Sequence, residues 1–126
     1  MLAPFAVDAT MSLRDSIDRW TSRDSIRGAA VVSEDGLVIH DALTPGTDTE
    51  AVAALAVSLV RTGQQLGQAA GAGRLGAVVL ELDHSPAILT TLDGGHTLVV
   101  LAQPNHDLGR LLFDIRQGRS ALSEAV

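Results

Sequence analysis

Three glycines in the stretch GAGRLG, Gly71, Gly73 and Gly76, have the G-x-G-x-x-G spacing of dinucleotide-binding loops. Such a loop binds a pyrophosphate only when a strand leads in and a helix leads out, because the free N–H groups of the helix then face the phosphates. Here a helical pattern precedes the glycines and a strand pattern follows them, the reverse of the required order. We therefore predict no nucleotide site. Instead, Gly71 ends a helix, while Gly73 and Gly76 loosen the turn into the strand.

The stretch Asp83-His84-Ser85 holds the three residue types of a serine-hydrolase triad. Consecutive residues cannot form a triad's hydrogen bonds, because a triad is assembled from separate parts of a fold. We therefore predict a polar turn. Glu81 is the only charge in an apolar segment, and no partner carboxylate is in sight. It is predicted to face outward from a strand rather than act as a general acid.

Metal and thiol chemistry find no support in the sequence. The chain has no cysteine, which excludes disulfides, thiolate metal sites and cysteine nucleophiles. Its four histidines stand singly, without the i, i+4 pairing of a helical zinc site, and are predicted to be solvated: His40, His84, His96 and His106. We predict a non-enzymatic protein with no catalytic residues, no metal and no cofactor.

Length and charge narrow the class of protein and its partners. The 126 residues suit one domain, and the formal net charge is −6. All nine basic residues are unclustered arginines, so we predict no nucleic-acid partner, since that binding relies on neutralising phosphates. No stretch approaches the ~20 apolar residues of a membrane helix, so we predict no membrane insertion and a cytoplasmic protein. Residues 1–10 are predicted to be a flexible leader, and 11–126 a single domain.

Hydrophobic periodicity and turn residues predict elements in the order α-β-β-α-β-β-β-α. The Asp35-Gly36 pair joins the first two strands as a hairpin, and Thr47 with Glu50 has capping-box spacing before the long helix. The predicted segments are helix 11–24, strands 28–33 and 37–41, helix 49–70, strands 76–83, 87–93 and 96–102, and a last helix that opens at Pro104-Asn105.

The last three predicted strands are joined by short turns and form a meander, which leaves 76–83 and 37–41 as the sheet edges. Strand 76–83 carries Val78, Leu80 and Leu82 on one face and Ala77 and Val79 on the other, with no proline or lysine to guard it. Such an edge invites pairing. We predict that it pairs with its own copy across a twofold axis.

The long helix has few charges. Its core stripe is predicted to be Val52, Leu55, Ala56, Leu59, Gly63, Leu66 and Ala70. From Ala51 to Gly73 only Arg61 is charged, and the side away from the stripe is predicted to hold Ala53, Val57, Arg61, Gln64 and Gln68. That side is either a bland, alanine-rich surface or a second contact face; we favour a contact face.

The order and spacing of four stretches resemble the Roadblock family, the small domains of dynein light chains and bacterial GTPase regulators. The stretches are GAAVVSEDGLVI (28–39), EAVAALAVSLV (50–60), GAVVLELD (76–83) and GHTLVVLAQPNHDLG (95–109). The likeness is greatest to stand-alone bacterial members, the MglB-like polarity regulators, which work with a Ras-like GTPase. It implies an α/β (α+β) fold, a profilin-like Roadblock sandwich. In that fold a five-stranded, mainly antiparallel sheet carries the long helix on one face and the N- and C-terminal helices on the other.

The resemblance also implies a homodimer with a continuous sheet and two central helices side by side. Carried over by position, the dimer interface would comprise Ala53, Ala54 and Val57 of the helix and Ala77, Val78, Val79, Leu80, Glu81 and Leu82 of the strand. The partner, a small Ras-like (MglA-like) GTPase or another Roadblock protein, would face Arg61, Gln64 and Gln68.

The predicted function is therefore that of a homodimeric regulator or scaffold for such a GTPase. Any stimulation of hydrolysis would come from reordering the GTPase's own switch loops, since a mid-helix Arg61 is poorly placed to serve as an arginine finger. One alternative is a small-ligand sensor with a pocket between sheet and helix. Against it, the aliphatic predicted core offers no convergent polar groups. The other alternative is a structural adaptor without a GTPase partner.

Overall fold

The computed structural model describes residues 12–104 and 107–125. The predicted order of elements is confirmed, with one 3-10 turn added before the last strand. The predicted leader, residues 1–10, lies outside the described residues. No helix of the described part is long and apolar enough to cross a membrane. The elements are α1 (Leu13–Thr21), β1 (Ile26–Val32), β2 (Val38–Ala42), α2 (Thr49–Ala69), β3 (Val78–Leu80), β4 (Ala87–Thr91), η1 (Asp93–Gly95), β5 (Thr97–Ala102) and α3 (Leu108–Ala125).

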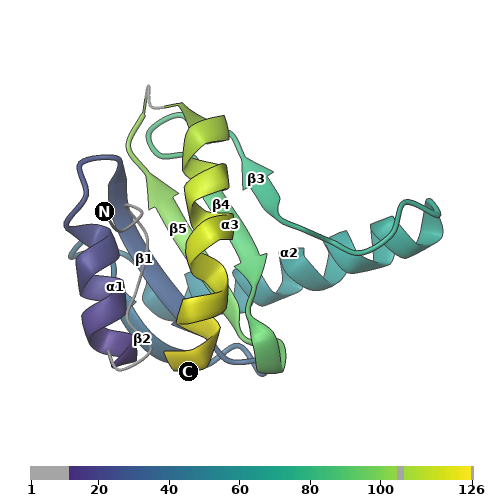
Figure 1. Ribbon diagram of the computed structural model, residues 1–126, viewed down its shortest axis with the longest axis horizontal. Helices are drawn as coiled ribbons and strands as arrows, with labels where there is room; N and C mark the ends of the chain where they lie inside the picture. The colour runs from purple at the N-terminus through teal and green to yellow at the C-terminus, as the bar shows by residue number, and fades with distance from the viewer. Residues whose placement is uncertain (1–11, 105–106, 126) are drawn as a thin grey trace.

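A five-stranded antiparallel sheet in the order β2-β1-β5-β4-β3 forms the middle layer (Figure 1). β4 lies between β3 and β5, so the predicted meander is confirmed, and so are the two predicted edges, β2 and β3. β3 is shorter than the predicted 76–83. It has a neighbour on one side only, and its pairing with β4 ends where Leu80 meets Ala87, because the chain then turns.

Helices cover both faces of the sheet, as predicted. α1 and α3 lie over one face, where Ile17 and Trp20 are fully buried (Figure 1). α2 covers the opposite face, where Ala56 packs. Alternate residues of β1 serve the two cores: Val31 belongs to the α1–α3 core and Val32 to the α2 core. This two-sided burial explains why β1 reads as a continuous apolar run.

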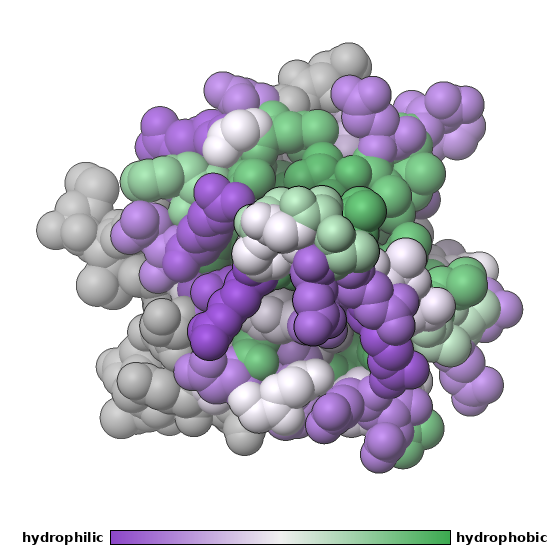
Figure 2. All heavy atoms as spheres, turned by 90° about the vertical axis from the view of Figure 1, so that its right-hand side faces the viewer, coloured by the Kyte–Doolittle hydropathy of each residue, from purple (hydrophilic) through white to green (hydrophobic). Residues whose placement is uncertain are grey.

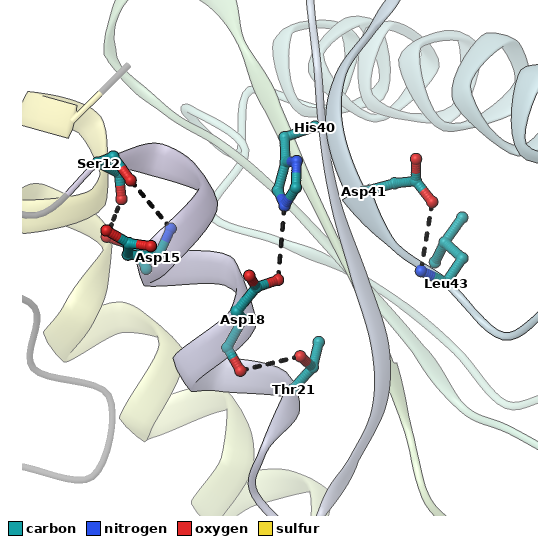
Figure 3. Close-up of polar contacts among 8 residues, drawn as sticks. Ser12, Asp15, Asp18, Thr21, His40, Asp41 and Leu43 are labelled. Carbon is teal, nitrogen blue, oxygen red and sulfur yellow. Dashed lines mark hydrogen bonds and ion pairs between the residues drawn. The ribbon is translucent and has the colours of Figure 1, made fainter.

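α1 is capped at its start and linked to the edge strand β2 (Figure 3). The Ser12 hydroxyl accepts a hydrogen bond from the Asp15 N–H at 3.2 Å, which satisfies a free donor of the first turn. Further along the helix, Asp18 Oδ1 lies 3.6 Å from His40 Nε2 of β2. The His40 side chain is only 17% exposed, so the prediction that this histidine is solvated is wrong.

The N-terminus of α2 is capped by Asp48, whose carboxylate accepts a hydrogen bond from the Ala51 N–H at 3.2 Å. The predicted capping box of Thr47 and Glu50 is therefore wrong, since the cap lies one residue later than Thr47. A carboxylate in this place also complements the positive end of the helix.

Small residues of α2 face the sheet. Ala53, Ala56 and Val60 are 1%, 3% and 5% exposed, respectively. The strand side chains beneath them are mostly valines and leucines, with one alanine, Ala30. Small helical side chains let the helix approach that surface closely, as the close packing of protein interiors demands.

The predicted core stripe of α2 is right for Ala56, which is buried, and for Val52, which packs against the core, but it is wrong for the leucines. It placed Leu55, Leu59 and Leu66 inside, but these side chains are 63%, 37% and 69% exposed. The C-terminal end of α2 also projects beyond the sheet, so no strand lies beneath it (Figure 1). Large apolar side chains usually mark the core side of a helix, whereas on α2 these leucines mark an outer surface.

Candidate functional site

The glycines of GAGRLG close α2 and return the chain along it. Gly71 has a φ of +63°, and the N–H groups of Gly71 and Ala72 donate to the carbonyls of Gln68 and Gly67 at 3.1 and 2.8 Å. This pair of hydrogen bonds is a Schellman C-cap. A helix leads in and β3 follows, as predicted, so these glycines do not lead into a helix N-terminus whose N–H groups could face a phosphate.

The stretch Asp83-His84-Ser85 is a turn between β3 and β4, as predicted. The Ser85 hydroxyl donates to the Ala102 carbonyl at 2.8 Å in a buried position, so its hydrogen bond ties the turn to β5. Asp83 and His84 are exposed. Glu81 follows the end of β3 and is also exposed. Ser85 therefore stabilises the fold, and the side chains of Glu81, Asp83 and His84 face the solvent.

The histidines are scattered over the fold. His84 is exposed, His40 lies beside Asp18, and His96 is partly buried with no hydrogen-bond partner for its Nδ1 within the described part of the chain. His106 lies outside the described residues. Among residues 12–104 and 107–125, no group of three or more histidine, aspartate or glutamate side chains is arranged to hold a metal ion.

Four exposed leucines and one partly buried leucine, from α2 and the β3 segment, form one continuous surface, which we call the apolar face. It consists of Leu55, Leu59, Leu66, Leu80 and Leu82. A hollow of about 220 Å³ between α2 and β3 is lined by apolar side chains alone. A second hollow, of about 660 Å³, continues past Leu66 along the projecting end of the helix. Such a surface is typical of a protein–protein contact.

The β3 edge borders the apolar face. β3 pairs with β4 along one side only within the described chain, so its other side presents unpaired backbone groups. Val79 is 44% exposed on the sheet face opposite Leu80. Leu80 and Leu82 belong to both the edge segment and the apolar face, which makes the two surfaces one.

The residues predicted for the dimer interface fall into different places. The prediction that Ala53 contacts a second copy is wrong, because its side chain lies in the chain's own core and offers no surface to a partner. Val57 is partly buried against the same core, and Ala54 is exposed. In the strand segment Val79, Glu81 and Leu82 are exposed, and Ala77, Val78 and Leu80 are partly buried.

The residues predicted to face a partner lie together on the other side of α2. Arg61, Gln64 and Gln68 are all exposed, and we call them the polar flank. Two hollows border it and share Gln64 and Thr91, so they form one groove. Figure 2 looks onto the projecting end of α2. It shows hydrophobic side chains gathered above the helix end and hydrophilic ones below it.

Sequence reasoning missed Leu55, Leu59 and Leu66 as surface residues and did not single out Glu34, which lines the hollow beside Arg61. A signal for the leucines was present: the helix also carries a stripe of alanines and glycines, the residues best suited to close packing on a sheet. No local pattern marks Glu34, because it lies in the β1–β2 turn, which only the folded chain places beside α2.

A five-stranded antiparallel sheet with one long helix on one face and two helices on the other defines a Roadblock-type α+β domain. The Roadblock/LC7 domain model matches residues 14–102, and the chain belongs to that family.

Related proteins agree with this assignment. Two uncharacterized proteins of Methanocaldococcus jannaschii, MJ0310 and MJ1340, are each 29% identical over 94 residues, which is 75% of this chain and 82% of theirs. The structure of Myxococcus xanthus MglB has a TM-score of 0.80 at 21% identity and covers 89% of this chain and 92% of its own. A Roadblock/LC7 domain from Streptomyces avermitilis has a TM-score of 0.76 at 26% identity, covering 92% and 95%.

Proposed function

We propose that this chain is a non-enzymatic, cytoplasmic regulator or scaffold that forms a homodimer and binds a small Ras-like GTPase or another Roadblock protein. The observation that carries the proposal is the continuity of the apolar face with the unpaired β3 edge. Membership of the Roadblock/LC7 family supports the regulatory role.

A second copy of the chain is the occupant that fits the apolar face best. The β3 edge can add a strand, and two identical antiparallel edges related by a twofold axis satisfy each other's backbone groups. The exposed leucines of one copy would then meet those of the other, because they lie beside that edge. Glu81 is the only charge between Val78 and Leu82, so charge repulsion across the axis would be small.

The polar flank is the surface proposed for the GTPase or Roadblock partner. It remains on the far side of α2 when the leucines are covered, so dimer formation and partner binding do not compete. The solved relatives include MglB and MglC from Myxococcus xanthus and a structure described as MglB with a tetrameric arrangement. The tetrameric arrangement of that relative supports assembly of this chain with further Roadblock proteins.

The dimer is tested by light scattering on the wild-type chain and on Leu55→Glu/Leu59→Glu. We expect a wild-type mass of twice 13.1 kDa and a single-chain mass for the variant, because four glutamates would meet across the twofold axis. Leu37→Glu is the control, since Leu37 is 68% exposed on another part of the surface. A monomeric wild type, or a variant that stays dimeric, would contradict the proposal.

The partner is tested by capture of a Ras-like GTPase from the same organism, loaded with GDP or a GTP analogue. We expect Arg61→Ala/Gln64→Ala/Gln68→Ala to weaken capture at least about tenfold while the dimer persists, because three contact side chains are lost together. Arg61→Ala alone should keep any stimulation of hydrolysis. Loss of stimulation with binding retained would instead identify Arg61 as an arginine finger. A triple variant that captures every GTPase as well as the wild type would exclude the polar flank.

A further inference from the structure

A half-enclosed pocket of about 300 Å³ lies between α2 and the turns at one end of the sheet. Its walls come from α2, from the turn that joins β1 to β2, and from the segment between β4 and β5. Its base includes Val60, Leu92 and Thr97, which are 5%, 4% and 3% exposed. The pocket is therefore closed beneath and open to solvent above.

Two opposite charges line this pocket without pairing. Glu34 comes from the β1–β2 turn and Arg61 from α2. Among residues 12–104 and 107–125, neither side chain forms an ion pair or a side-chain hydrogen bond, with the other or elsewhere. Gln64, Thr91 and Thr97 add further polar side chains to the lining.

Gly95 makes room for the Glu34 carboxylate. A Cβ built at Gly95 would lie 3.0 Å from Glu34 Oε2, and Gly95 has a φ of +87°. Both the space and the backbone conformation favour glycine at this position. The carboxylate thus lies against the β4–β5 turn, at the wall of the pocket.

We infer that this pocket binds a small zwitterion with an ammonium and a carboxylate group, of the class of free α-amino acids. The ammonium would meet Glu34 and the ligand carboxylate would meet Arg61, each through charge-assisted hydrogen bonds. A ligand with a single charge could pair with only one of these two side chains. The volume stands at the lower end of ligand pockets, which suits a ligand of the size of a free amino acid. The apolar part of the base, Val60 and Leu92, suits a short aliphatic side chain.

This inference goes beyond the proposed regulator and does not depend on it. It also supports the alternative of a small-ligand sensor, because polar side chains converge in this pocket between α2 and the end of the sheet. A partner's loop with adjacent basic and acidic side chains would satisfy the same two charges. The closed base and small volume favour a free small molecule, and the loop is a distinct outcome of the test.

The test is an NMR titration of the ¹⁵N-labelled chain with glycine, L-leucine and L-glutamine. We expect saturable shifts of the Thr91, Leu92, Gly95 and Thr97 amides, with a dissociation constant on the order of a millimolar for so few ligand atoms. Methylammonium and acetate, which carry the two charges separately, should shift these amides far less. Absence of shifts with all three amino acids, or equal shifts with the single-charge probes, would overturn the inference.

Glu34→Gln and Arg61→Gln should each weaken amino-acid binding about three- to tenfold, the modest range expected for exposed charges. Glu50→Gln and Arg27→Gln are matched controls, because both residues are exposed and neither lines the pocket.

Equal weakening of amino-acid binding by all four variants would overturn the inference. So would amino acids that never bind while Glu34→Gln abolishes GTPase capture, which would assign the pocket to a partner loop. A monomeric chain that still binds amino acids would contradict only the proposed regulator.

Discussion

Ala53→Glu is expected to destabilise the folded chain by at least about 3 kcal/mol, because it places an unpaired carboxylate in a packed core. Ala53 is 1% exposed and belongs to the core between α2 and the sheet. The facing side chains there are aliphatic and offer the charge no partner. Such a loss is a large share of the stability of a small domain. Urea denaturation followed by far-UV circular dichroism measures it.

Ala54→Glu is the matched control, with the same substitution at the neighbouring position of the same helix. Ala54 is exposed, so its replacement should change the free energy of unfolding by no more than about 0.5 kcal/mol. Equal losses at Ala53 and Ala54 would contradict the face of α2 described above. The pair also bears on the dimer: a charge at Ala53 acts on folding, whereas charges at Leu55 and Leu59 act on association.

Gly67→Ala is expected to destabilise the chain by about 2 kcal/mol through overpacking. A Cβ at Gly67 would lie 2.5 Å from the Gly73 carbonyl oxygen, a backbone atom that cannot move alone. The clash outweighs the ~1 kcal/mol by which alanine is the better helix former. Because Gly73 lies in the returning segment, faster amide hydrogen exchange over 71–77 should accompany the loss. Urea denaturation and hydrogen exchange measure the two effects.

Gly63→Ala separates this clash from helix propensity. A Cβ at Gly63 would approach the Leu75 side chain at 3.1 Å, and a leucine rotamer can adjust where a carbonyl cannot. We expect nearly unchanged stability. A Gly67→Ala variant as stable as Gly63→Ala would show that the returning segment is free to shift away from α2.

The opposite flanks of α2 explain how one helix can serve two contacts. The leucines lie beside the β3 edge, and the arginine and glutamines lie beside the turns at the end of the sheet. From Ala51 to its end α2 carries one charge, Arg61, and so few charges would be unusual for a helix on a free monomer, since solvent faces ordinarily carry charge. Its scarcity of charge is consistent with contacts on both flanks.

Much of the fold could be predicted from the sequence, because local patterns carry it. Alternating and continuous apolar runs predicted the strands, and the Asp35-Gly36 hairpin together with the short turns predicted the meander and its two edges. The position of GAGRLG, after a helical pattern and before a strand pattern, predicts a helix end and not a dinucleotide-binding loop. Each of these rests on neighbouring residues, whose backbone preferences act over a few positions.

The tertiary structure alone decided which side of α2 is buried and which charged side chains line the same pocket. Periodicity shows that a helix is amphipathic, but the space left above the sheet determines whether leucines or alanines fit beneath it. That space depends on side chains from β1, β4 and β5, far away in the sequence. Glu34 and Arg61 likewise line one pocket because chain folding brings a turn to a helix. Interactions over such separations leave no local pattern in the sequence.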